Sequence, residues 1–230
     1  MGTPVRYPNG VTNNTPTSPT AMLPVLDPSN VQMYFNDFHV YTAGDWTETA
    51  VSVGTGTSAS AISDAAGGVV TLTSAANEND GAWYESQGES WTVEAGKKMW
   101  IKVRFKTSDA TQSDIIFGLH STSTTPQSAA NRFLFESVDG SAAVYFNSDD
   151  NTNDEDSDTV ATLADATWIT LAAYWDGVDT VELFADGVKV TSFTPTTTPT
   201  TELALGWGQL NGSASVETLD VDYILVAKER

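Results

Sequence analysis

Cysteine is absent from the 230-residue sequence, and histidine nearly so, with two residues. Without thiols the chain cannot form disulfides, thiolate metal sites or a cysteine nucleophile, so its stability must come from packing. Basic residues number ten against thirty acidic ones, and the resulting net charge of -20 repels nucleic acid and anionic membrane surfaces. We therefore expect no nucleic-acid partner. A strongly acidic surface also keeps an abundant protein soluble, which competes with a specific cationic partner as the explanation.

Long apolar runs and helical periodicity are missing as well. No run of about 18 apolar residues occurs, and no apolar segment with a basic start follows Met1. We expect a chain that is made in a cytoplasm and contacts no membrane. Threonine, serine and aromatic residues are spread along the sequence instead, and these favour strands over helices.

The first 30 residues differ from the rest in holding six of the nine prolines. Proline fixes φ and lacks an N–H donor, so this segment is unsuited to a helix or a central strand. We predict an extended arm over residues 1–30 and one sandwich domain over residues 31–230. A disordered tail is the alternative. As an arm, the segment would anchor on a neighbouring subunit or partner through Pro4, Val5, Tyr7, Pro8, Met22 and Leu23.

From Tyr34 onward, short alternating runs are separated by Gly, Asn, Asp and Ser, which is typical of an all-β sandwich. The strongest turn signal is Asp186-Gly187, a two-residue hairpin loop, and Asp139-Gly140 is a weaker one. The predicted strands are 34–41, 69–73, 82–85, 99–107, 114–120, 132–137, 142–147, 168–175, 181–185, 188–193, 202–207 and 216–227.

Several of these segments resemble the concanavalin A-like lectin/glucanase superfamily over residues 34–228. They are Phe117-Gly118-Leu119, Phe133-Leu134-Phe135, Trp168 to Trp175, the Asp186-Gly187 hairpin and the final Val221-Asp222-Tyr223-Ile224. The resemblance implies a jelly-roll β-sandwich, a fold that serves both enzymes and binding proteins.

A second resemblance is to structural proteins of tailed bacteriophages, and within that group to capsid decoration (cement) proteins. The residues that carry it are Pro4-Val5-Arg6-Tyr7-Pro8-Asn9-Gly10-Val11, Tyr34-Phe35-Asn36-Asp37-Phe38 and Gly44-Asp45-Trp46. It implies a virion protein on the capsid exterior, made in the host cytoplasm, with the major capsid protein as its partner. It also implies a homo-oligomer, with a trimer suited to threefold positions.

Catalytic patterns are missing. Glucanases of this fold place carboxylates on alternate residues of one strand, and the nearest case here is Asp220-x-Asp222, with Leu219, Val221, Tyr223 and Leu225 expected on the opposite face. A solvated outer face explains these two acids as well. His39 and His120 lie near no Gly-x-Ser-x-Gly turn, and two separated histidines do not make a zinc site. We therefore expect no enzyme, no catalytic residue and no cofactor.

The stretch 147–158 contains six carboxylates. Alternating oxygen ligands can wrap calcium, but Asp154 and Val160 stand where an EF-hand needs Gly and Glu. A flexible acidic loop is the commoner outcome of such a sequence, so we predict no metal site.

Half of the basic residues lie between Lys97 and Lys106. The alternation places Met99, Ile101, Val103 and Phe105 on one face of a strand. The opposite face then forms a docking surface for an acidic partner, with the candidate residues Lys98, Trp100, Lys102, Arg104 and Lys106. Protection of an edge strand by lysines is the alternative.

These observations predict a non-catalytic binding protein. The first hypothesis is a capsid decoration protein that reinforces the assembled shell by binding only that state. The second is a lectin-like module of a phage receptor-binding or tail protein that holds a host-surface glycan. Candidate aromatic shelves for the glycan are Trp83-Tyr84 and Trp207, although most large aromatic residues of a sandwich lie in its core.

Overall fold

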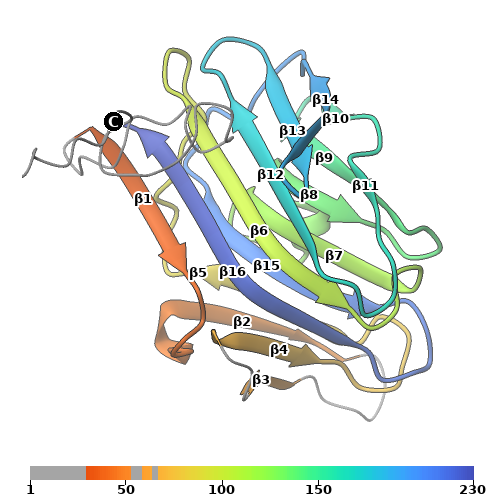
Figure 1. Ribbon diagram of the computed structural model, residues 1–230. Helices are drawn as coiled ribbons and strands as arrows, with labels where there is room; N and C mark the ends of the chain where they lie inside the picture. Colours follow the sequence, from red (N-terminus) through yellow and green to blue (C-terminus); the bar gives the residue numbers. More distant parts are fainter. Residues whose placement is uncertain (1–29, 53–58, 64–66) are drawn as a thin grey trace, which may run out of the picture.

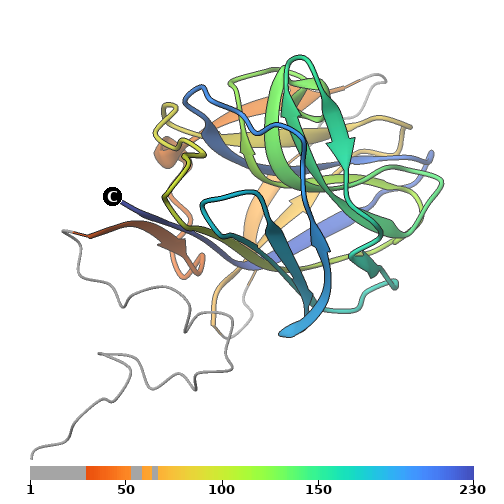
Figure 2. The same cartoon turned by 90° about the horizontal axis from the view of Figure 1, so that it is seen from above.

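The computed structural model describes residues 30–52 and 67–230 in full and residues 59–63 by their backbone. The predicted arm contacts Pro4, Val5, Tyr7, Pro8, Met22 and Leu23 lie outside the described residues. Two antiparallel sheets, A and B, are stacked face to face, so the predicted all-β sandwich is confirmed (Figures 1 and 2). Within the described residues, no helix is long and apolar enough to cross a membrane.

Sheet A is the front sheet in Figure 1. Its order is β14 (Val188–Phe193), β13 (Val181–Ala185), β12 (Ile169–Trp175), β6 (Met99–Thr107), β16 (Thr218–Glu229), β4 (Val69–Thr73) and β3 (Ala59–Ser63), and β1 (Val31–Asn36) also pairs with β16.

Sheet B lies behind it. Its order is β10 (Asp154–Asp156), β9 (Ala143–Asp150), β8 (Asn131–Ser137), β7 (Ser113–His120), β15 (Ala204–Asn211), β5 (Gly81–Ser86) and β2 (Trp46–Val51), and β11 (Ala161–Thr162) also pairs with β9. The 3-10 turns η2 (Ala43–Asp45) and η3 (Pro126–Ser128) lie in connections.

All twelve predicted strands are present, and β4, β6, β13 and β14 have the predicted bounds. The strand predicted over 34–41 is β1, which ends at Asn36. There the Asn36 Oδ1 accepts a hydrogen bond from the Phe38 N–H, and Phe38 takes a positive φ of 51°, which ends extended structure. The predictions omitted β2, β3, β10 and β11.

Both predicted hairpin turns are confirmed. Asp186 and Gly187 have φ values of 48° and 79°, as a type I′ turn between β13 and β14 requires. Asp139-Gly140 lies in the longer loop between the paired strands β8 and β9, with Gly140 at a φ of 81°.

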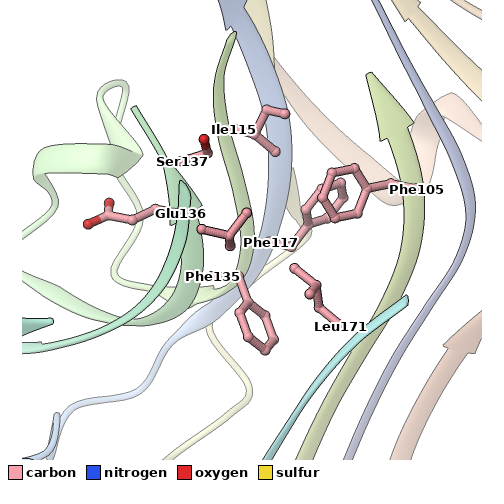
Figure 3. A pocket seen from close by; sticks show the side chains of 8 residues that line it. Phe105, Ile115, Phe117, Phe135, Glu136, Ser137 and Leu171 are labelled. Atoms are coloured by element: carbon pink, nitrogen blue, oxygen red, sulfur yellow. The ribbon is translucent and has the colours of Figure 1, made fainter. Parts of the chain in front are cut away.

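The core lies between the sheets. Met99, Ile101, Val103 and Phe105 of β6 point into it as predicted, together with the alternate residues of β7. Figure 3 shows Phe105, Phe117 and Leu171 meeting in this layer, with Glu136 on the far side of β8. Because side chains fill the space between the sheets, a binding surface would lie on one of the two outer faces or at an edge.

Candidate functional site

The outer face of sheet A contains the predicted docking residues. Lys98, Trp100, Lys102, Arg104 and Lys106 do alternate with the core residues of β6. Trp100, however, is buried against Tyr174 and Phe184 and presents no surface. Moreover, β6 lies between β12 and β16, so edge protection is the wrong explanation for its lysines.

Two of the basic side chains on this face are neutralised by the neighbouring strand. Arg104 forms an ion pair with Asp222, and the Lys106 Nζ lies 3.0 Å from an Asp220 oxygen. Both cations also lie over the Trp168 ring, at 4.5 and 5.2 Å from its centroid. Lys102 instead lies 5.5 Å from the centroid of Tyr223. The cationic row is therefore partly satisfied within the chain, and its docking role stays a prediction.

The face assignment predicted for Asp220-x-Asp222 is wrong in its second half. A bulge in the pairing of β16 with β6 lies between Val221 and Tyr223. Because an extra residue reverses the alternation, Ile224 and Val226 enter the core, and Tyr223 and Leu225 face outward. The two acids serve as partners for Arg104 and Lys106 on sheet A.

The outer face of sheet B has a flat floor made of glycine. Gly206 and Gly118 are register partners at its centre, and Gly208 lies beside Ile116. A Cβ on Gly206 would lie 1.9 Å from the His120 Nε2, and one on Gly118 would lie 2.6 Å from the Leu134 Cα. Glycine at position 206 therefore leaves room for the His120 ring, and glycine at position 118 allows the close approach of β8.

The connection between β7 and β8, residues 121–130, covers this floor; we call it the β7–β8 loop. At its start the Ser123 N–H donates to the Glu85 Oε1, and the Thr122 N–H to Glu89. Near its end the Gln127 Nε2 donates to the Ser137 carbonyl oxygen. Trp83, Ile116 and Leu134 form an apolar cluster on the outer face, and although they point away from the core they are 2% exposed or less.

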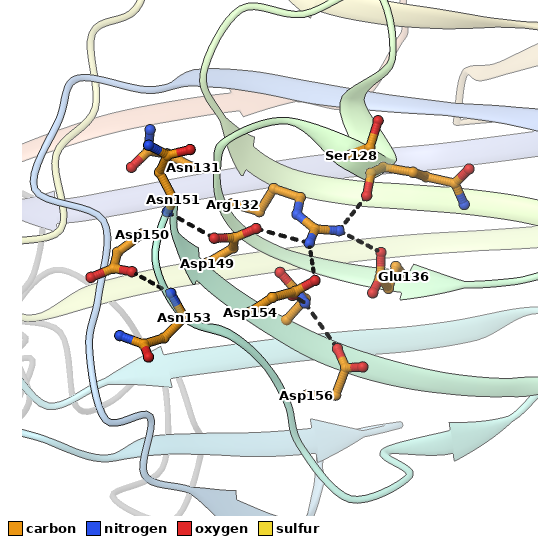
Figure 4. A network of polar contacts seen from close by, with 12 residues as sticks. Ser128, Asn131, Arg132, Glu136, Asp149, Asp150, Asn151, Asn153, Asp154 and Asp156 are labelled. Atoms are coloured by element: carbon orange, nitrogen blue, oxygen red, sulfur yellow. Dashed lines mark hydrogen bonds and ion pairs between the residues drawn. The ribbon is translucent and has the colours of Figure 1, made fainter.

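On the outer face of sheet B, Arg132 of β8 lies at the centre of a cluster of acidic side chains from β8, β9 and β10 (Figure 4). Its guanidinium lies 3.0 Å from Asp149, 2.7 Å from Asp154 and 3.5 Å from Glu136, and it donates to the Gln127 carbonyl oxygen. The Asn147 Nδ2 donates to Asp154 and Asp156.

These contacts fold the acidic stretch into a β9–β10 hairpin, so the expectation of a flexible loop is wrong. Asn151 in the turn has a positive φ of 70°. In the described part of the chain, no group of three or more His, Cys, Asp or Glu side chains is arranged to hold a metal ion.

Burial shifts the titration of several side chains on this face, among them Asp114 on β7, whose pKa is raised by desolvation. Desolvation raises the pKa of Glu85, raises that of Glu136 to about 7, and lowers that of His120. The His120 Nδ1 lies 3.0 Å from the Ser121 carbonyl oxygen and 3.5 Å from Glu85. Sequence reasoning considered His120 only as a catalytic or zinc-binding histidine and missed Glu85 and Glu136, although the outward positions Asp114, Ile116, Gly118 and His120 of β7 could have been read from the alternation.

Glu85 and Glu136 are too far apart to form a glycosidase pair, and the Asp114 carboxyl, which is nearer to Glu136, accepts a hydrogen bond from the Asp139 N–H. Glu85 on β5 and Glu136 on β8 are separated by β15 and β7. Three strand spacings of about 4.8 Å put them about 14 Å apart or more, beyond the ~5–9.5 Å that glycoside hydrolysis uses. The arrangement suits anchoring of the β7–β8 loop.

A separate open groove lies between β1 and the end of β5. It has a volume of about 400 Å³ and is lined by the Tyr34 and Trp91 rings and by polar groups of Gln32, Asp45, Gln87 and Ser90, among others. Such a mixed lining suits a neutral polar ligand. The aromatic shelves predicted at Trp83-Tyr84 and Trp207 are wrong, because all three rings are buried.

Three solved structures illustrate the fold similarity. A protein of unknown function from Shewanella oneidensis has a TM-score of 0.61 at 16% identity, with 87% of each chain covered. An endo-1,3-beta-glucanase from Streptomyces sioyaensis has 0.59 at 13%, covering 88% of this chain and 98% of that one. The Emp47p carbohydrate recognition domain has 0.56 at 10%, covering 87% and 98%. At these identities the similarity shows the fold alone.

Sequence comparison assigns the family. No curated protein matches the chain. A family model described as concanavalin A-like lectin/glucanases superfamily matches residues 85–219, which is more than half of the 230 residues. That span runs from β5 into β16 and includes the glycine floor, the β7–β8 loop and the Arg132 cluster. The chain therefore belongs to the concanavalin A-like lectin/glucanase superfamily.

Proposed function

We propose that this chain is a non-catalytic binding protein that decorates and stabilises a phage capsid by attaching to the major capsid protein. The observation that carries the non-catalytic part is the covered outer face of sheet B. Its central strand presents Ile116, Gly118 and His120 at successive outward positions, and the β7–β8 loop lies over them. Among the described residues, these central outward positions are buried, and Glu85 and Glu136 are separated by two strands.

The virion role is supported by the sequence resemblance and by the charges left over on sheet A. Among the described residues, no carboxylate lies within ion-pair distance of Lys98 or Lys102, in contrast to Arg104 and Lys106. Two uncompensated cations on an otherwise acidic protein suit an acidic surface of the capsid. Attachment through them weakens as salt rises.

The test is co-sedimentation with empty capsids assembled from the phage's own major capsid protein. We expect the full chain to sediment with capsids, and Lys102→Glu to bind less, with the larger loss at low salt. Lys189→Glu on β14 makes the same charge change elsewhere on sheet A and serves as the control. Deleting residues 1–30 tests the arm. A chain that ignores capsids and hydrolyses a β-glucan overturns the proposal.

A second candidate is the lectin-like role, and the groove between β1 and β5 favours it. Its aromatic and amide lining resembles what a sugar ring needs for stacking and hydrogen bonding. Binding of neutral oligosaccharides that is lost in Tyr34→Ala but retained in Trp168→Ala would support this role. If the protein binds no oligosaccharide on a glycan panel, the lectin-like role is excluded.

A further inference from the structure

Strand β1 lies at an edge of sheet A as far as the described residues show. In the described part of the chain β1 pairs only with β16, so one row of its backbone N–H and C=O groups has no partner strand. Figure 1 shows β1 at the margin of the sheet beside β16. Open rows of this kind are templates for pairing with another strand.

The other long edge strands with described side chains are protected, whereas β1 is not. On β14, Lys189 forms a 2.8 Å ion pair with Glu182, and a bulge interrupts the pairing of this strand with β13. On β2, Glu48 is exposed. Strand β1, with the sequence VQMYFN, has six residues and contains no charge, no proline and no glycine. In a chain of net charge -20, such an uncharged edge is the part that another acidic molecule can approach.

The outward side chains of β1 are apolar; Val31 is buried against Trp100 and its neighbours, and the other two are exposed. Met33 is 46% exposed and Phe35 is 52% exposed. The Phe35 ring lies 6.1 Å from that of Tyr223 on β16, and Leu225 lies beside Phe35 in register. The edge therefore continues into an apolar patch on the outer face of sheet A, as interaction surfaces commonly do.

We propose that β1 pairs in antiparallel fashion with β1 of a second copy of this chain, centred on Met33. A two-fold axis through Met33 places Met33 opposite Met33, Val31 opposite Phe35, and Gln32 opposite Tyr34. Residues opposite each other in an antiparallel pair share a face, so apolar side chains meet on the outer side and polar ones on the inner side.

This register explains why a second copy suits the edge. The interface is self-complementary, as a two-fold dimer requires, and no two charges of the same sign face each other between residues 30 and 36. Sheet A of one copy then continues into sheet A of the other, and the two apolar patches become one. The inference goes beyond attachment to a capsid, since the dimer forms without one.

The absence of native cysteine makes the register directly testable. In the full-length Met33→Cys variant under mild oxidation, we expect rapid formation of disulfide-linked dimers, because opposed residues lie within disulfide reach. Val190→Cys on β14, an edge residue that is 49% exposed, is the matched control and should cross-link only slowly. Equal or faster cross-linking of the control overturns the proposed interface.

Light scattering of the full-length chain over a dilution series measures the oligomeric state. We expect a dimer, and we expect Met33→Lys to raise its dissociation constant about tenfold or more, because two lysines then face each other. Unchanged thermal unfolding of the Met33→Lys monomer shows that the fold is intact. A wild-type monomer, a trimer, or a dimer indifferent to Met33→Lys overturns the proposal, whichever segment or partner covers β1 instead.

Discussion

The outer face of sheet A keeps its charges at the surface, whereas the outer face of sheet B keeps them beneath a loop. Arg104 on sheet A has a side chain that is 36% exposed, and Arg132 on sheet B has one that is 6% exposed, yet each contacts aspartate. The difference shows that an arginine–aspartate ion pair contributes differently to stability in the two places. Water screens the first, while the second must satisfy a guanidinium that has lost its hydration.

The largest effect is expected from Arg132→Met. It leaves Asp149 and Glu136 buried without their cation, which should lower the free energy of unfolding by about 3–5 kcal/mol. Urea denaturation at neutral pH measures this. A loss no larger than that of Arg104→Met would break the contrast between the faces.

Gly206→Ala should follow in size. The added Cβ collides with the His120 ring, and overpacking of this kind costs about 2–3 kcal/mol. Gly44→Ala is the matched control, because nothing lies within 4 Å of its Cβ position. Similar stability of the two variants would show that His120 can leave the glycine floor without cost.

Glu136 should make stability depend on pH. Its carboxyl keeps a proton up to about pH 7 in the folded chain and up to about pH 4.5 in the unfolded one, so the folded state binds more protons in between. The free energy of unfolding therefore falls as pH rises through this window, by about 2–3 kcal/mol, because each unit of pKa difference is worth about 1.4 kcal/mol. Glu136→Gln removes this contribution, which is obtained as the difference between the two pH profiles. A variant that shows the wild-type slope would contradict it.

The smallest effect is expected on sheet A. Arg104→Met and Lys106→Met each break a surface pair and a contact with Trp168, and each should cost about 1 kcal/mol or less. Chemical denaturation with and without added salt checks the value. A cost as large as that of Arg132→Met would show that the ion pairs on the two faces contribute equally to stability.

Period-two alternation was enough to predict most of the strands. It placed β6 with its correct inner face because Met99, Ile101, Val103 and Phe105 alternate with polar residues over a long run. It missed β2, in which only Trp46 is buried, so the apolar signal was too weak. It also failed after Asp222, since a bulge leaves no mark in the local pattern of apolar residues.

The covered face of sheet B could not be predicted from local sequence. Its key contact joins Ser123 to Glu85, 38 residues apart, across strands whose order is set by the whole fold. The shifted titration of Glu136 likewise follows from burial beneath a loop. Arg132 was read only as part of a strand, because its three acidic neighbours, Glu136, Asp149 and Asp154, come from three different strands.

The glycine floor limits which substitutions the centre of sheet B can accept. An acidic side chain introduced at position 206 would have to occupy the volume that the His120 imidazole already fills, and one at position 118 would strike the backbone of β8. A carboxylate at either position would thus require coordinated replacements of its neighbours, with unstable single variants along the way. Where strands and side chains approach this closely at the centre of a sheet, a single larger side chain is accepted only if its neighbours move.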